Sequence, residues 1–355
     1  MGTSIFAFII VLGVLIFFHE LGHFLVARLF GVGVEKFSLG FGPRIFGKTI
    51  GMTDYRVSAF PLGGYVKMVG ESPGDEIEPE KIGISFTHKH VAKKMMIVAA
   101  GPFFNLLLAM IIFFFIYMFS GLYELKPTIG SVGDGSPAQR QGLEKNDLIV
   151  AIDGVPIQTW NDLARIIAGS DGRSLTLSID RSGTFLDIPV TPELSEAQNF
   201  FGEAVDRYVI GIIAGGDVFT REIGFLEAIS ESTLQTVSIT KLTVVSIYKL
   251  IQGTLSRETI GGPIMIAQMA GQQAKEGAQN LAFFIALLSI NLAVINFLPI
   301  PVLDGGHLFF FTIEAIIRRP LNTRMREVAQ QIGIFVLLML MIYVFYNDIN
   351  RLILS

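Results

Sequence analysis

The sequence predicts a polytopic α-helical membrane protein with four transmembrane helices and one inserted soluble α+β module. The 355 residues are 51% hydrophobic and only 16% charged, a composition too apolar for an ordinary soluble protein. Apolar runs long enough to cross a bilayer recur towards both ends of the chain. Between them, residues 123–222 regain charges and show short strand-like runs separated by turns, which predicts the module.

Charge and cysteine content exclude several function classes. The net charge of −4 excludes a strongly basic nucleic-acid binder, so we expect no nucleic acid as a partner. The chain has no cysteine, which excludes disulfides and thiolate metal sites. The expected surroundings are membrane lipid.

The first apolar segment, residues 1–30, contains the motif His19-Glu20-Leu21-Gly22-His23. Residues four apart share a helix face, so both histidines can direct a ring nitrogen at one metal ion. Glu20 beside them is placed to take a proton from a water molecule that the metal activates. A lone buried histidine is usually a satisfied core residue, but ionisable groups at membrane depth are costly and functional by default. We therefore expect a Zn²⁺ site with Glu20 as the catalytic base.

A third zinc ligand is expected on another apolar segment, because catalytic zinc sites use three protein ligands. The apolar run 281–298 ends in a Pro/Gly-rich break that carries Asp304. Irregular backbone at this depth must be buried or line a cavity, which makes Asp304 the natural candidate. His307 is a rival ligand, and capping of a helix end is the alternative role for Asp304. Asn296 is expected to hydrogen-bond the substrate backbone or the oxyanion.

Residues 31–94 are polar and rich in glycine. Runs 57–60 and 65–69 flank Pro61-Leu62-Gly63-Gly64, which predicts a β-hairpin with short strands around a tight turn. Unpaired strand edges can bind an extended peptide by strand addition, so Gly63, Gly64 and Tyr65 are candidate substrate-binding residues. A purely structural hairpin fits the spacing equally well.

The second span and the module follow. Residues 95–122 contain Gly101-Pro102 and Asn105, and a helix breaker and a polar group at that depth should face the protein interior. In the module, a helix is expected at 160–168 and half-buried strands at 175–179 and 185–190. Its pattern Ser136-Pro137-Ala138, Gln141-Gly142-Leu143 and 147–154 resembles a bacterial-type PDZ domain. Such domains bind extended chain ends, so a peptide ligand is a candidate partner; a spacer without ligand is the alternative.

The arginines before the last span predict the topology. Four of them at 318, 319, 324 and 326 place that loop on the cytoplasmic side. With four spans, the N-terminus and the module lie outside, and His19 and Asp304 both lie near cytoplasmic ends. A fifth span at 224–251 would put Asp304 at the opposite face from His19. We therefore expect 224–251 to be an amphipathic interfacial helix.

The predicted organisation has eight parts: a first transmembrane helix (1–30), a cytoplasmic-side loop with the hairpin (31–94), a second transmembrane helix (95–122), the PDZ-like domain (123–222), an interfacial helical region (223–279), a third transmembrane helix (280–306), a cytoplasmic loop (307–331), and a fourth transmembrane helix with the C-terminus (332–355).

Three motifs together resemble the site-2 protease family. They are H-E-x-x-H, Gly101-Pro102-x-x-Asn105, and Asn296-x-x-Pro299-x-Pro301-x-Leu303-Asp304-Gly305. Segments 37–42, 57–68 and 301–307 are similar, more closely, to bacterial RseP-type zinc proteases. The resemblance covers essentially the whole chain. One departure is that 123–222 has room for a single PDZ domain, whereas many RseP-type proteins carry two.

The resemblance implies regulated intramembrane proteolysis in the bacterial inner membrane, with the PDZ-like domain on the periplasmic side. Implied substrates are transmembrane proteins: single-span anti-sigma factors and signal-peptide remnants. It also implies that Asp304 is the third zinc ligand, that Asn296 handles substrate, and that the hairpin is a membrane-associated β-hairpin that presents the substrate strand. Asn105 of the second-span motif is a further candidate substrate-binding residue. A catalytically silent scaffold and a metal transporter are the competing classes. The intact Glu20 argues against a scaffold, and the few ionisable groups at depth argue against a transporter.

Overall fold

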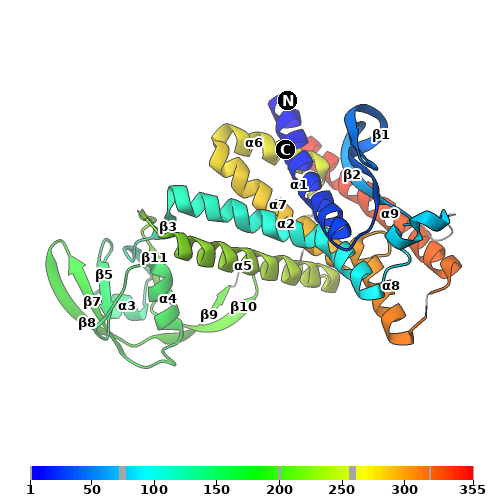
Figure 1. Cartoon of the computed structure of the whole chain (residues 1–355). Helices are drawn as coiled ribbons and strands as arrows, with labels where there is room; N and C mark the ends of the chain where they lie inside the picture. Colours follow the sequence, from blue (N-terminus) through cyan, green and yellow to red (C-terminus); the bar gives the residue numbers. More distant parts are fainter. Residues whose placement is uncertain (1, 72–76, 199–200, 256–260, 320, 355) are drawn as a thin grey trace. The chain divides into compact units, whose positions relative to one another are not determined.

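The chain folds into two compact units. The computed structural model describes residues 2–71, 77–198, 201–255, 261–319 and 321–354. Met1–Ile116 and Leu226–Ser355 form one unit, here called the membrane unit, and Tyr117–Phe225 form the other, here called the inserted module. Figure 1 labels their elements.

Four described helices are long and apolar enough to cross a bilayer: α1 (Gly2–Leu29), α2 (Val91–Ser120), α7 (Ala278–Phe297) and α9 (Thr323–Leu354). This confirms the prediction of four apolar helices and makes the chain a multi-pass membrane protein. The second and fourth helices begin earlier than predicted, at 91 and 323.

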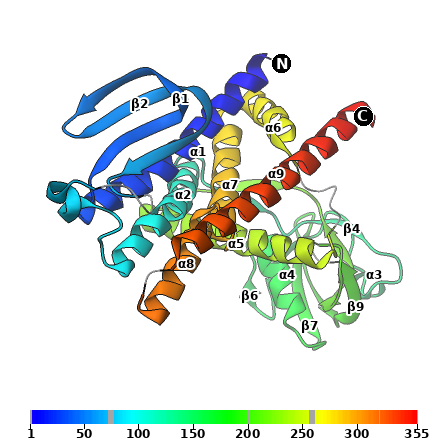
Figure 2. The same cartoon turned by 90° about the vertical axis from the view of Figure 1, so that its right-hand side faces the viewer.

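The segment after the first helix forms two long antiparallel strands, β1 (Val34–Ile50) and β2 (Thr53–Met68), which lie beside α1 (Figure 2). The predicted tight turn at Pro61–Gly64 is wrong. The chain turns at 51–52, and residues 61–64 lie inside β2, where the register shifts between Leu39 and Phe41. Pro and Gly in a strand interior mark such irregularities as well as turns, which explains the error.

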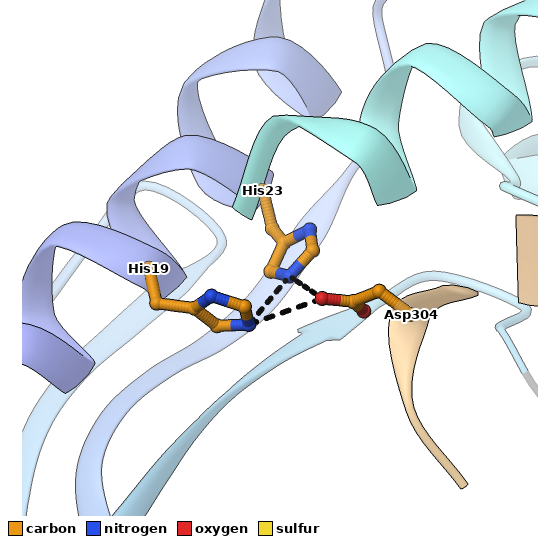
Figure 3. A group of neighbouring side chains, drawn as sticks. All are labelled: His19, His23 and Asp304. Carbon is orange, nitrogen blue, oxygen red and sulfur yellow. Dashed lines mark hydrogen bonds and ion pairs between the residues drawn. The ribbon is translucent and has the colours of Figure 1, made fainter. Parts of the chain in front are cut away.

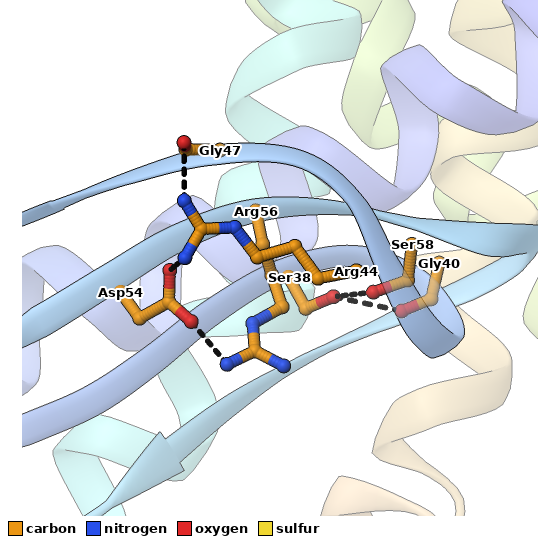
Figure 4. Close-up of polar contacts among 7 residues, drawn as sticks. All are labelled: Ser38, Gly40, Arg44, Gly47, Asp54, Arg56 and Ser58. Atoms are coloured by element: carbon orange, nitrogen blue, oxygen red, sulfur yellow. Dashed lines mark hydrogen bonds and ion pairs between the residues drawn. The ribbon is translucent and has the colours of Figure 1, made fainter.

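Residues 36–39 of β1 are paired on both sides, with 64–67 and with 54–57. Strand β2 therefore contacts β1 twice, and the two strands form a curled sheet. Among the described residues, 64–67 form strand pairs with β1 alone. Polar contacts hold the far part of this sheet together (Figure 4): Arg44 and Arg56 both pair with Asp54. Ser38 and Ser58 are buried and hydrogen-bonded to each other at 2.9 Å.

The described part of the membrane unit also contains the α-helices α5 (Phe225–Gln252), α6 (Pro263–Glu276) and α8 (Asp304–Ile317), and a short 3₁₀ helix at Pro79–Ile84. The predicted loop at 307–331 is wrong, because α8 and the start of α9 occupy most of it. Helix α5 forms as predicted at 224–251 and is not among the candidate spans. Its Thr243 hydroxyl donates to Asn291 of α7 at 3.0 Å, so the two helices are linked by a polar contact.

Helices α1 and α2 approach closely at two glycines. A Cβ on Gly22 would lie 2.3 Å from the carbonyl oxygen of Ala100. A Cβ on Gly101 would lie 2.3 Å from Nε2 of His23. There is no room for a side chain at either position. These two glycines therefore allow the backbone of α2 to pass directly over the histidines.

The inserted module contains a four-stranded antiparallel sheet in the order β6 (Val155–Pro156), β5 (Leu148–Ile152), β7 (Leu175–Arg181) and β8 (Thr184–Val190). Helix α4 (Trp160–Ala168) forms as predicted. The remaining elements are the strand β3 (Leu122–Leu125), β4 (Ile129–Val132), the short helix α3 (Pro137–Arg140), β9 (Glu193–Gln198), β10 (Ala204–Val209), β11 (Ile212–Ala214) and β12 (Val218–Arg221).

The module has its own apolar core, which includes Ile149, Leu163 and Leu177. Its buried Asp147 receives two hydrogen bonds of 2.7 Å from Arg181. These bonds raise the pKa of the Arg181 guanidinium above its usual value. The chain enters the module through β3 and leaves it through β12. These two strands pair with each other, so the ends of the module lie side by side.

Candidate metal centre and active site

Two elements bring together the three metal-ligating side chains that the sequence predicts. His19 and His23 lie one turn apart on α1, and Asp304 is the first residue of α8 (Figure 3). Asp304 Oδ2 lies 3.2 Å from His19 Nε2 and 3.5 Å from His23 Nε2, and the two Nε2 atoms are 3.3 Å apart. The three side chains are 14%, 10% and 17% exposed.

This triangle fits a zinc ion. Nitrogen and oxygen ligands about 2.0–2.2 Å from a tetrahedral zinc stand about 3.3–3.6 Å apart. The observed separations of 3.2, 3.3 and 3.5 Å match that requirement. Asp304 Oδ2 is also buried without a hydrogen-bond partner, and a buried carboxylate oxygen in this position calls for a cation. Two imidazoles and one carboxylate form a donor set that zinc uses in hydrolytic enzymes.

The break before α8 positions Asp304. A Cβ on Gly305 would lie 2.2 Å from the carbonyl oxygen of Leu298, and one on Gly306 2.3 Å from that of Ile300. The glycines thus let α8 start directly against the end of α7. The N-cap residue of α8 is Leu303, and no described side chain caps that end, so the structure gives Asp304 no capping role.

A cavity of about 300 Å³ opens beside the triangle. Its lining includes His19, Glu20, His23, Gly64, Tyr65, Asp304 and His307. His307 lies outside the group of converging ligand atoms that the described residues form. Burial lowers the pKa of His307 below the usual histidine value.

Three of the predicted substrate-binding residues do not line this cavity. Asn105 is fully buried, and its amide nitrogen lies 3.2 Å from His19 Nδ1. Asn296 is 9% exposed. Gly63 lies against the ring of Phe41, so closely that a Cβ at this position would be 2.1 Å from a ring atom.

The structure adds cavity residues that the sequence did not single out as part of a site. Lys94 and Arg326 line the cavity, and both form an ion pair with Glu314, which is buried and does not line it. Lys94 is part of a basic cluster before a span, a pattern that indicates an interfacial anchor. No spacing in the sequence links it to the glutamate on α8.

Comparison with known proteins agrees with these features. The model of Peptidase family M50 matches residues 7–340. The chain is 36% identical to a protein of Mesorhizobium japonicum, with 98% of this chain and 99% of that protein covered. It is 38% identical to a protein of Campylobacter jejuni (98% and 93%) and 37% identical to one of Clostridium perfringens (94% and 95%). All three bear the designation zinc metalloprotease in their names.

Four apolar helices and a histidine pair facing a carboxylate define a membrane-embedded zinc metalloprotease. The chain belongs to Peptidase family M50, the site-2 protease family.

Proposed function

We propose that the chain is an endopeptidase that cleaves peptide bonds within transmembrane segments of single-span membrane proteins. The observation that carries this proposal is the position of the histidine–carboxylate triangle between two apolar segments of a four-span unit. A soluble protein substrate would not need a site between membrane helices. Anti-sigma factor-like proteins and signal-peptide remnants are the substrate classes that an RseP-type enzyme would cleave.

In this proposal His19, His23 and Asp304 hold the zinc ion. When bound, zinc supplies Lewis-acid activation of water and of the scissile carbonyl. The chain's own part is to keep the two imidazoles and the carboxylate fixed on two rigid helices. Their exposed fractions, all below one fifth, limit competition from bulk water.

Glu20 is the proposed general base. It follows His19 directly on α1 and lines the same cavity, so its carboxylate can reach the attacking water. It takes the proton from that water and later delivers it to the nitrogen of the leaving amine. Gly64 of β2 lies against it, since a Cβ on Gly64 would be 3.0 Å from Glu20 Cγ.

The strand segment 64–68 is the proposed substrate platform. In the described part of the chain it forms strand pairs with β1, and Gly64 and Tyr65 also line the cavity. A substrate helix must unwind before its backbone is accessible, and a strand beside the cavity can offer backbone hydrogen bonds to the unwound segment.

Photo-crosslinking tests this platform. A benzophenone amino acid replaces Tyr65 in a Glu20→Gln background, and the matched control carries it at Phe46, an exposed aromatic of β1. We expect a single-span substrate to crosslink at position 65 and not at position 46. Equal crosslinking at both positions contradicts a specific role for this strand segment.

Zinc titration tests the ligand set. Asp304→Ala removes one proposed ligand, and His307→Ala removes the neighbouring imidazole on the same helix. We expect Asp304→Ala to lose zinc at concentrations where the wild type is saturated, and His307→Ala to retain one zinc per chain. Loss of zinc only from His307→Ala would show that His307, and not Asp304, is the third zinc ligand.

The inserted module is the proposed peptide-binding domain, of PDZ type. A groove of about 400 Å³ lies between α4 and residues 207–213, and its lining includes Trp160, Ala164 and Ile212. An apolar groove of this kind suits the extended, apolar end of a trimmed substrate. We propose that this module lies on the periplasmic side of the bacterial inner membrane. The arginines at 318, 319, 324 and 326, around the start of α9, favour a cytoplasmic position for that end of α9, and with four spans the module then lies on the other side.

Tryptophan fluorescence tests the groove directly, because Trp160 is the only tryptophan in the chain. Peptides with free apolar C-termini should change the emission of the full-length protein saturably. Ala164→Glu places a charge on the exposed groove wall without touching the core and should abolish the change. The same peptides with amidated C-termini are the ligand control. An identical change of emission with these amidated peptides, or in Ala164→Glu, would contradict binding of chain ends.

A further inference from the structure

The two histidines of the proposed zinc site must each present Nε2 in its unprotonated form. A neutral imidazole carries one proton, so Nε2 can bind a metal only when Nδ1 carries that proton. Both Nε2 atoms face Asp304, as described above. The groups that face the two Nδ1 atoms therefore decide whether the histidines are ready to bind.

For His23 the partner is a backbone carbonyl. Nδ1 of His23 lies 2.9 Å from the carbonyl oxygen of Ile97 on α2. A carbonyl can only accept, so this contact requires the proton on Nδ1 and leaves Nε2 free. Gly101, one turn further along α2, gives the room for this approach.

For His19 the partner is the side-chain amide of Asn105. Asn105 Nδ2 lies 3.2 Å from His19 Nδ1, while Asn105 Oδ1 is buried and has no hydrogen-bond partner. An amide nitrogen that donates to Nδ1 places the imidazole proton on Nε2, the atom that faces Asp304. Rotation of the amide by half a turn exchanges its two ends and directs Oδ1 at Nδ1–H.

The surroundings of Asn105 favour a structural partner over a substrate. The residue is 0% exposed. Its own backbone carbonyl accepts a 2.7 Å hydrogen bond from Ser289 of α7, which fixes this turn of α2. Ile97, Gly101 and Asn105 are spaced by four residues and so form one face of α2 over the histidine pair.

We propose that Asn105 is a positioning residue, whose Oδ1 accepts from His19 Nδ1–H and so sets the His19 tautomer that binds zinc. Ile97 does the same for His23 through its carbonyl. The inference rests on the proposed role of the two histidines as zinc ligands, and it replaces the sequence-based expectation that Asn105 contacts substrate. Partners of this kind typically change metal affinity by about 10–100-fold.

Zinc affinity is the first measurement. Asn105→Leu keeps the side-chain volume but removes the acceptor, and we expect its zinc affinity to fall about 10–100-fold. Asn105→Asp keeps an acceptor oxygen and should bind zinc within about threefold of the wild type, since carboxylates serve the same role in other zinc sites. Ser289→Ala removes only the contact to the backbone and is the control for helix packing. Wild-type affinity in Asn105→Leu overturns the proposal.

The second measurement reads the tautomer and does not depend on any variant. The chain has five histidines, so ¹⁵N-histidine labelling gives few resonances. With zinc added to the full-length wild type, we expect two histidines that bind through Nε2 and keep a protonated Nδ1. Binding of His19 through Nδ1 overturns the positioning role alone. Absence of any zinc-dependent histidine resonance overturns the proposed ligand set instead, so the two failures are distinguishable.

Discussion

Both units of the protein bury carboxylates, but they satisfy them differently. In the inserted module, Asp147 is 1% exposed and both its oxygens accept from Arg181. In the membrane unit, Asp304 Oδ2 is buried without a hydrogen-bond partner. Among the described residues, every buried side-chain polar atom without a partner lies in the membrane unit: Arg56 Nε, Asn105 Oδ1, Asp304 Oδ2 and Arg326 Nε.

This difference in how buried carboxylates are satisfied indicates that the module's carboxylate stabilises the fold, whereas the membrane unit's carboxylate serves a binding site. An unsatisfied buried polar group costs about 1–3 kcal/mol, so its presence in a folded protein needs a reason. Two of the four atoms, Asn105 Oδ1 and Asp304 Oδ2, belong to side chains that contact His19. We read this as the mark of a metal site, and the module shows no such cluster among its described residues.

The largest expected effect on stability is in the module. Arg181→Ala leaves Asp147 buried without its cation and should lower the module's free energy of unfolding by about 3 kcal/mol. Arg165→Ala removes an exposed pair on α4 and should cost less than about 1 kcal/mol. Thermal unfolding followed by Trp160 emission measures both. Equal losses of stability in the two variants would contradict the role given to the Arg181–Asp147 pair, and a loss of zinc affinity in Arg181→Ala would contradict an effect confined to the module.

The next effect should fall on the metal site alone. Gly101→Ala places a Cβ only 2.3 Å from His23 Nε2 and forces this ring to move, so zinc affinity should drop about 10–100-fold, as for other groups that orient ligands. Gly13→Ala is the control, because a Cβ there meets nothing within 4 Å on the same apolar helix as the histidines. Competition with a zinc chelator gives both affinities. An unchanged affinity in Gly101→Ala would mean that the α1–α2 contact is looser than described.

The smallest effect sharpens the comparison inside the membrane unit. Asp348 of α9 is also a buried carboxylate, but it accepts from the backbone N–H groups of Gly262, Ile264 and Met265 at the start of α6. Asp348→Ala should lower the free energy of unfolding by about 1 kcal/mol, as for other lost helix caps, and leave zinc affinity unchanged. Asp348→Asn retains an acceptor and should lie closer to the wild type in chemical denaturation. A change in zinc binding would contradict a purely capping role.

The short motifs of the membrane unit made its site predictable from the sequence. Spacing alone placed His19 and His23 on one helix face, and the break after α7 indicated Asp304. The four spans followed from hydropathy. The 160–168 helix of the module followed from its local pattern, as did the position of strands near 175–179 and 185–190.

Contacts between distant segments were not predictable. The contact between Asn105 and His19, 86 positions apart, depends on how α2 crosses α1, and no local pattern encodes that crossing. The turn at 51–52 was missed because Pro61 and Gly63-Gly64 give a stronger turn signal than Gly51 alone. Helix α8 was missed because the charged residues at 318–326 suggested that the whole segment 307–331 is a loop.

Zinc content and cleavage, measured together on the wild type and on Glu20→Gln, test the central claim most directly. The substrate is a purified single-span membrane protein in detergent, and the readout is both zinc per chain and cleavage rate. The account predicts one zinc in each protein and a cleavage rate about 10²–10⁴-fold lower in Glu20→Gln. Cleavage by Glu20→Gln at the wild-type rate, or loss of its zinc, would contradict the assignment of Glu20 as the base beside an intact metal site.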